Sequence, residues 1–256
     1  MSFTTWRASA MALVAVIYGG ATMAKAADQH WSQQQTYVSN SEIASKHLAV
    51  DFVPDGNLSK PAWRAATWVK VDHDSFKPIT FPEAATDVAT RWTAKYVYFA
   101  FRCKYTALNL YDSKDTSKDY WQLWDRDVIE IFLNPEPEHM RHYFEFEVAP
   151  NNLWIDLEIN LVNAKINADA KWNSGFEHVT LIDEKDHIWT SEWRIPVAAL
   201  IGSKSLQANA EWRINIFRCD GLGDDTKRRF LSWSLVHNDN DSFHAPWSFG
   251  VIRFVK

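Results

Sequence analysis

The chain has 256 residues, of which 46% are hydrophobic and 23% are charged, and its formal net charge is −5. This composition is that of a soluble globular protein with a sizeable core, and the length suits one large all-β domain or two small ones. The acidic balance excludes the basic footprint of a nucleic-acid-binding protein and argues against binding to anionic lipids or polyanionic glycans.

The N-terminus has the pattern of a secretory signal peptide. Arg7 supplies a positive charge, residues 8–21 form a short apolar run, and Ala24-Lys25-Ala26 has the small-x-small form of a cleavage site. The run is too short to span a bilayer, and no later segment is apolar for long enough. We predict cleavage after Ala26, a flexible lead-in over 27–36, one domain over 37–256 and a periplasmic or secreted product without a transmembrane segment. Polar residues up to about position 46 indicate a loose start.

Short runs with a period of two follow one another from residue 47 onward, separated by turn residues. Helix is scarce, with single turns expected at 119–123 and 197–201. Such a series predicts an all-β fold, a single-domain antiparallel β-sandwich with jelly-roll or immunoglobulin-like layers and one or two short helical turns. The expected strands are 88–92, 96–105, 127–133, 142–148, 153–161, 176–182, 188–195, 211–219, 230–234 and 248–255.

Two cysteines, Cys103 and Cys219, each end the same tripeptide Phe-Arg-Cys near the end of a predicted strand. Export permits a disulfide, but the sequence does not give the Cα separation that a disulfide requires. Bridged and free cysteines therefore both stay open. Arg218 lies on the opposite strand face from Cys219, where it either forms a structural ion pair or donates hydrogen bonds to a ligand.

The aromatic content is high, with 14 Trp, 15 Phe and 8 Tyr. Tryptophan is too large to be buried completely every time, so some indoles should reach the surface. Trp121 and Trp124 precede a strand that carries Glu130, and indoles beside a carboxylate suit a sugar ring, which has an apolar face and a polar rim. The alternative is a loop whose tryptophans cap a sheet edge.

A run of oxygen-bearing side chains at 238–241 includes Asp239 and Asp241, which are ligands of the kind that Ca²⁺ prefers. The run lacks the glycine and the distant glutamate of an EF-hand loop, and a solvated turn, which needs no metal, is the favoured interpretation. His244, just after this run, either caps the closing strand or reaches a binding site.

Catalytic motifs are missing from the sequence. It contains no Gly-x-Ser-x-Gly, no His-Glu-x-x-His and no glycine-rich phosphate loop. Asp127 and Glu130 are three apart on one predicted strand and so point to opposite faces, a poor arrangement for the acid–base pair of a glycosidase. We therefore predict a protein that is not an enzyme, although a carboxylate pair from distant strands stays open.

Eight segments resemble, in order, the motifs of carbohydrate-binding module family 9, and in particular its stand-alone family 9-like bacterial relatives. Residues 53–63 are similar to the opening Asp-Gly-x-x-x-x-Pro-x-Trp, and 124–133 are similar to the strand Asp-x-Val-Glu-Ile-Phe. The segment around 193–200 resembles Glu-x-x-Ile-Pro-x-x-x-Leu. The other matching segments are 90–102, 143–150, 212–221, 231–233 and 243–250.

The resemblance implies a β-sandwich that binds a mono- or oligosaccharide derived from plant polysaccharides without catalysis, as a monomer. It requires no cofactor, although some members hold structural Ca²⁺. The family site places a sugar between two tryptophans, with a glutamate and an arginine. Trp124 and Glu130 fall on the matching motif. The second tryptophan and the arginine do not align cleanly, which leaves Trp233, Trp247 and Arg218 as candidates.

Two other interpretations stay open. The chain could be a structural or partner-binding sandwich of the cell envelope without sugar affinity. It could also be a haem-binding relative that uses Met140 with His139 or His142 as axial ligands, although it has no Cys-x-x-Cys-His attachment motif.

Overall fold

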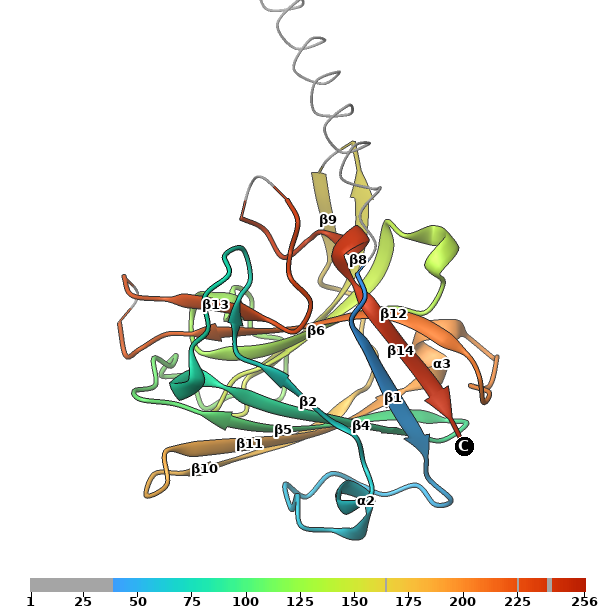
Figure 1. The fold of residues 1–256 in the computed structure, drawn as a ribbon, viewed down its shortest axis with the longest axis horizontal. Helices are drawn as coiled ribbons and strands as arrows, with labels where there is room; N and C mark the ends of the chain where they lie inside the picture. The colour runs from blue at the N-terminus through green and yellow to red at the C-terminus, as the bar shows by residue number, and fades with distance from the viewer. Residues whose placement is uncertain (1–38, 164, 225, 239–240) are drawn as a thin grey trace, which may run out of the picture.

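A computed structural model describes residues 39–163, 165–224, 226–238 and 241–256. These residues form one curled 14-stranded sheet with few helices, which confirms the predicted all-β sandwich (Figure 1). The predicted signal peptide and lead-in lie outside the described residues. Among the described residues, no helix combines the length and apolarity needed to cross a membrane.

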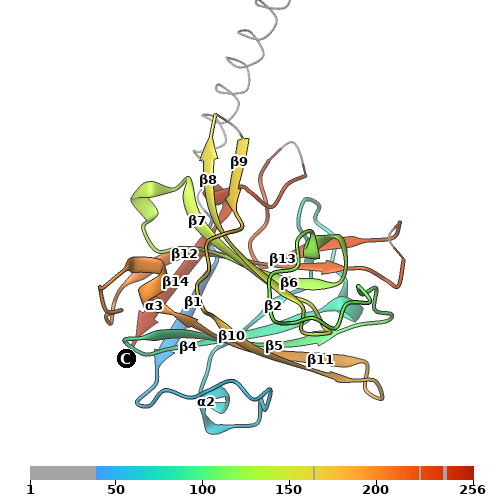
Figure 2. The same ribbon diagram turned by 180° about the vertical axis from the view of Figure 1, so that it is seen from behind.

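The sheet folds into two layers that pack face to face (Figures 1 and 2). The first layer consists of β10 (Glu177–Asp183), β11 (Ile188–Pro196), β5 (Tyr96–Lys104), β4 (Thr86–Trp92) and β2 (Trp68–Val71). The second layer consists of β12 (Glu211–Asp220), β6 (Val128–Asn134), β7 (His142–Val148), β8 (Trp154–Val162) and β9 (Lys165–Asp169). Two further strands, β13 (Arg229–Ser232) and β3 (His73–Asp74), extend β12 at one end.

The two layers are joined by β1 (Glu42–His47), which lies between β4 of the first layer and β14 (Gly250–Val255), the neighbour of β12. It runs parallel to both partners, so the sheet is mixed and not purely antiparallel as predicted. The prediction of loose structure up to residue 46 is also wrong. A six-residue strand with only Ile43 and Ala44 as apolar residues gives little periodic signal, and its order comes from hydrogen bonds to strands distant in sequence.

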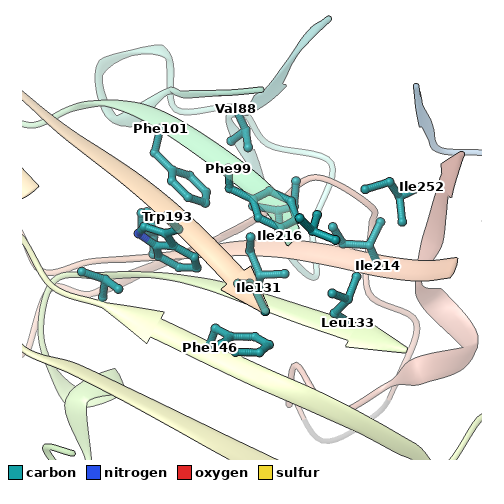
Figure 3. Packing of buried hydrophobic residues seen from close by; sticks show 14 of the residues in the cluster. Val88, Phe99, Phe101, Ile131, Leu133, Phe146, Trp193, Ile214, Ile216 and Ile252 are labelled. Carbon is teal, nitrogen blue, oxygen red and sulfur yellow. The ribbon is translucent and has the colours of Figure 1, made fainter. Parts of the chain in front are cut away.

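The main core lies between the layers and is built by period-two alternation (Figure 3). On β5, Phe99 and Phe101 point inward and meet Trp193 from β11. From the other layer, Ile131 of β6 and Ile216 of β12 complete the packing. Burial of this aromatic and branched surface supplies the main stabilisation of the fold.

Short helical segments connect the strands. The predicted turn at 197–201 is confirmed as α3 (Val197–Ile201), and α2 (Pro61–Arg64) covers the outside of the first layer. The turn predicted at 119–123 is wrong, because Gln122 adopts a left-handed conformation (φ 65°) and the helical turn starts after it, as η2 (Leu123–Asp125). The other turns are η1 (Pro82–Ala84), η3 (Pro137–His139) and η4 (Pro246–Ser248).

Candidate functional site

A cavity of about 490 Å³ opens on the outer face of the second layer. Outward-facing residues of the strands form its floor, among them Glu130 and Phe132 of β6, Glu145 of β7 and Cys219 of β12. Strand β13 and loops that approach from elsewhere in the chain form its walls. The loops contribute Trp121, Trp124, Arg228, Phe243 and His244, and β13 contributes Phe230. The cavity therefore combines an aromatic wall with an acidic floor.

The two tryptophans are presented by a tight turn. Leu123, between them, is fully buried and anchors the turn, and the carbonyl of Trp124 accepts a hydrogen bond from the Arg228 guanidinium. Trp121 is 52% exposed and Trp124 is partly exposed. Their ring centroids are 5.1 Å apart at an interplanar angle of 80°, so the indoles meet edge to face as a corner. They cannot hold a ring between them, but each leaves indole surface open to the cavity.

Three glutamates lie together at the floor. Glu130 of β6 pairs in register with Glu147 of β7, and Glu145 lies two residues earlier on the same strand face. All three are buried, and one carboxylate oxygen of each lies within 4.8 Å of those of the other two. Alternation explains the grouping, because every second residue of paired strands shares a face.

Burial and mutual repulsion disfavour the ionised forms of these carboxylates. Burial, followed by the charge of Glu145, raises the pKa of Glu130 to about 8, and the nearby thiol of Cys219 and the charge of Arg228 oppose the shift. Burial raises the pKa of Glu145 to about 7. The pKa of Glu147 is raised well above its ordinary value, first by burial and then by Glu130 and Glu145.

Sequence reasoning missed Glu145 and Glu147 as site residues. They alternate with Phe144 and Phe146, which is the ordinary pattern of a strand with one solvated face. The signal that could have found them is their pairing with Glu130 across the β6–β7 hairpin. Their burial depends on covering loops from positions near 121 and 243, which no local pattern reveals.

Four of the predicted ligand-binding residues, namely Trp121, Trp124, Glu130 and His244, line the same cavity, as does the predicted metal ligand Asp241. Asp239 lies outside the described residues. The imidazole of His244 shares a 2.7 Å hydrogen bond with the Tyr143 hydroxyl, and burial lowers its pKa to about 4, so it is neutral at physiological pH.

The other three candidates lie elsewhere. Trp247 is buried at 2% exposure in η4, and its indole N–H donates to the carbonyl of His237. Trp233 packs against the main core and borders a separate hollow beside Lys77. Arg218 points to the inner face of β12, away from Glu130 and Cys219 on the outer face. None of these three residues lines the cavity.

Arg218 forms the structural ion pair that was its alternative interpretation. Its Nη2 atom lies 3.2 Å from Asp220 Oδ1 and 3.5 Å from Asp127 Oδ1, and all three side chains are fully buried. Asp127 also accepts the backbone N–H of Asn109 at 2.6 Å. Asp127 and Glu130 thus face opposite sides of the sheet, as their spacing predicted.

Both cysteines are free and buried, so the disulfide alternative does not hold. The two cysteines face different sides of the sandwich, because alternate residues of a strand point to opposite faces. Cys103 faces the core between the layers, whereas Cys219 faces the cavity side and donates to Glu130 Oε1 at 3.2 Å.

We predict that a thiol reagent fails to label the folded protein and modifies both cysteines after denaturation without a reductant. Burial blocks access, and it raises the pKa of Cys103 to about 11 and that of Cys219 well above its ordinary value, so the reactive thiolate is scarce. Counting labelled thiols by mass spectrometry checks this. A denatured chain that reacts only after reduction would contradict it.

The residues of the haem interpretation lie away from the cavity. His139 and His142 have carboxylate partners, since His139 Nδ1 lies 3.2 Å from Glu136 and His142 Nε2 lies 2.7 Å from Glu158. Met140 is partly exposed between them and packs against the buried hydrophobic residues on the outer face of the second layer, such as Tyr143 and Ile159. A separate, open hollow of about 590 Å³ borders all three residues, and both of its histidines already have these carboxylate partners.

One protein-family model matches most of this chain. Residues 53–256 match the model of the family described as carbohydrate family 9 binding domain-like. A protein of Arthroderma benhamiae, named only as an extracellular protein, is 23% identical over 195 residues, which are 72% of this chain and 85% of that protein.

Solved structures share the fold at low identity. A candidate carbohydrate-binding protein of Bacteroides uniformis has a TM-score of 0.66 at 18% identity, covering 84% of this chain and 99% of the other. A family 9 carbohydrate-binding module of Caldicellulosiruptor kristjanssonii, in complex with cellotriose, has a TM-score of 0.59 at 16% identity, covering 84% of this chain and 94% of the other. The same module in complex with glucose gives a TM-score of 0.58.

Proposed function

Because this chain belongs to the carbohydrate family 9 binding domain-like family, we propose that its cavity binds a mono- or oligosaccharide without catalysis. The observation that carries this proposal is the corner of open indole surface, formed by Trp121 and Trp124, directly beside the buried carboxyl of Glu130. The relatives from Caldicellulosiruptor kristjanssonii are complexes with cellotriose and glucose, which makes β-linked glucose oligomers the first ligands to test.

The parts of the cavity match the two surfaces of a pyranose. The apolar C–H face of the ring stacks on one indole, and the exposed Trp121 allows a second ring of a longer chain to continue outward. Hydroxyls on the rim of the ring reach the carboxyls of Glu130 and Glu145 and the guanidinium of Arg228. Phe230 and Phe243 supply the remaining aromatic surface, in place of the second tryptophan expected from the resemblance.

The arrangement of the carboxyls supports binding over hydrolysis. Glycosidases place two carboxyl groups on either side of the scissile bond, about 5–5.5 Å apart for retention and about 6.5–9.5 Å apart for inversion. Glu130 and Glu145 instead lie on neighbouring strands of one floor, with oxygens within 4.8 Å. Asp241, in the loop between β13 and η4, is the other acidic lining residue among those described.

Export to the periplasm or the medium is the second part of the proposal. The signal-peptide pattern of residues 1–26 supports it, and so does the relative that is named as extracellular. Amino-terminal sequencing of the product made in its own host tests it: a first residue of Ala27 agrees, and a retained Met1 disagrees.

Replacing Trp124 with alanine should weaken oligosaccharide binding by about 1–3 kcal/mol, roughly 5- to 150-fold, because the stacking surface is lost. Calorimetric titration with glucose, cellobiose, cellotriose and xylobiose measures the change, and tryptophan fluorescence should shift on binding to the unmodified chain.

Trp68→Ala is the matched control, since this indole on β2 is 39% exposed but lies outside the cavity. The Trp68→Ala variant should bind the sugars with the same affinity as the unmodified chain. The proposal fails if no sugar binds, or if Trp124→Ala lowers the melting temperature while affinity is retained, which would identify Trp124 as a core residue.

A further inference from the structure

The three glutamates at the cavity floor leave a physical problem that the described residues do not solve. Both oxygens of Glu147 and one oxygen of Glu145 are buried without a hydrogen-bond donor among the described residues. A buried carboxylate without a donor or counter-charge carries a large desolvation penalty. Two carboxylates cannot satisfy each other, because each only accepts hydrogen bonds unless one holds a proton.

The nearby cation is insufficient for three acidic groups. Arg228 lines the cavity and acts electrostatically on Glu130. Its guanidinium, however, donates to the Trp124 carbonyl and lies 3.8 Å from Asp125. His244 is neutral and engaged with Tyr143. The cluster therefore has an excess of negative charge when its members ionise.

The geometry of the cluster fits one metal ion. Ca²⁺ binds six to eight oxygens at about 2.3–2.6 Å, so two ligands on opposite sides of the ion are about 4.6–5.2 Å apart. One carboxylate oxygen from each of Glu130, Glu145 and Glu147 lies within 4.8 Å of the other two, which is inside this limit. The three proposed ligands are all carboxylates, which favour a hard divalent cation, and the nearby Cys219 thiol donates to Glu130 Oε1 at 3.2 Å.

We propose that Glu130, Glu145 and Glu147 hold a divalent cation of the Ca²⁺ class at the floor of the cavity, where its open coordination positions bind hydroxyls of the sugar. Glu130 and Glu145 line the cavity itself, and Glu147 is buried beside them on the same face of the sheet, outside the cavity lining. The cation would thus lie at the edge of the cavity, where it also faces the ligand. The role towards the sugar rests on the proposed function, whereas cation binding stands independently of it.

A lone ammonium group, as in an amino sugar, is a weaker occupant. It carries one positive charge against three carboxylates, and Glu147 is not on the cavity surface where a sugar substituent could reach it. An ion coordinated between the strands contacts all three.

The first experiment measures cation binding without sugar. The full chain, stripped with a chelator, is titrated with Ca²⁺ and with Mg²⁺ by calorimetry, and with Tb³⁺ by luminescence excited through tryptophan. Trp121 and Trp124 border the same cavity and should sensitise the Tb³⁺ emission. We expect one Ca²⁺ per chain, weaker binding of Mg²⁺, and Tb³⁺ emission that Ca²⁺ abolishes. An absence of Ca²⁺ binding overturns the proposal.

Variants then locate the site. Glu147→Gln keeps the side-chain size, removes the charge and should weaken Ca²⁺ binding at least about tenfold, the smallest loss usual when a group that supports a metal is removed. The control Glu158→Gln removes a carboxylate of β8 that pairs with His142 outside the cavity and should leave Ca²⁺ affinity unchanged.

Glu145→Gln replaces Glu147→Gln if circular dichroism shows that the latter is unfolded. Ca²⁺ affinity that survives both substitutions but falls in Asp241→Asn places the ion in the turn near Asp241 and overturns the proposal.

The last arm adds cellotriose in the presence of Ca²⁺ or of chelator. Affinity that falls at least about tenfold in chelator supports the cation–sugar contact. Equal affinity in both conditions overturns that contact. If Ca²⁺ binds through Glu147 but no sugar binds under either condition, the proposed function fails while the cation site stands.

Discussion

Replacing Arg218 with methionine is expected to lower the free energy of unfolding by about 3–5 kcal/mol, the usual consequence of removing one partner from a buried ion pair. The substitution leaves Asp220 and Asp127 fully buried without their shared guanidinium. Asp220 keeps Arg229, whose Nε lies 2.8 Å from Asp220 Oδ2. Asp127 keeps the backbone N–H groups of Asn109 and Gly221, so the loss should not exceed this range. Urea denaturation followed by circular dichroism measures it.

The sequence offers a matched control in its second Phe-Arg-Cys tripeptide. Arg102 occupies the same place between Phe101 and Cys103, but it is exposed on the outer face of β5. Arg102→Met should change stability by no more than about 0.5 kcal/mol, as is usual for surface sites. Because Arg218 lies on the opposite face of β12 from the cavity, the folded Arg218→Met protein should keep its sugar affinity. Equal stability losses in the two variants, or a lost affinity in folded Arg218→Met protein, would contradict this account.

Replacing Glu192 with alanine should have an effect of similar size, about 3–5 kcal/mol. This buried carboxylate of β11 accepts the indole N–H of Trp63 at 2.7 Å and the backbone N–H groups of Asp55 at 2.8 Å and Gly56 at 3.0 Å. The Lys60 ammonium lies 2.8 Å from it. Its removal leaves these donors without their acceptor and releases the segment that packs α2 onto the first layer.

The effect of Glu192→Ala is measured by urea denaturation and by the rate of tryptic cleavage after Arg64. Cleavage should accelerate, because the segment loses the anchor that holds it against the sheet. Glu177→Ala on the adjacent strand β10 is the control, since Glu177 is 45% exposed at its side chain and forms a surface ion pair with Arg194, worth no more than about 1 kcal/mol. A cleavage rate that rises equally in both variants would refute the anchoring role.

The hydrogen bonds of Glu192 connect two of the segments that resemble motifs of the family. Asp55, Gly56 and Trp63 belong to the opening motif, and Glu192 begins the later Glu-x-x-Ile-Pro segment. These two segments are more than a hundred residues apart, yet the carboxylate of one accepts the hydrogen bonds of the other. The motifs thus preserve a stabilising contact of the sandwich, and they are separate from the cavity residues.

Local alternation was enough to predict most strands and the faces of their residues. The bounds of 142–148 agree with β7, and inward Phe99 and Phe101 and the opposed faces of Asp127 and Glu130 follow from period two alone. The same rule determines that Arg218 and Cys219 face apart. The order of the short motifs from residue 53 onward also indicated the family, and the match of the family model to residues 53–256 confirms it.

Which residues meet across the molecule was decided by tertiary structure alone. The Trp121–Trp124 turn, Phe243 and the Glu145–Glu147 strand form one cavity only because distant loops cover the outer face of the second layer. Buried glutamates look like solvated ones in a sequence, since both alternate with apolar neighbours, and the short parallel strand β1 is ordered only by its two partners. The alternation of residues along a strand shows which face of the sheet a side chain points to. Whether that side chain is buried, and which residues it contacts, depends on segments far away in the chain.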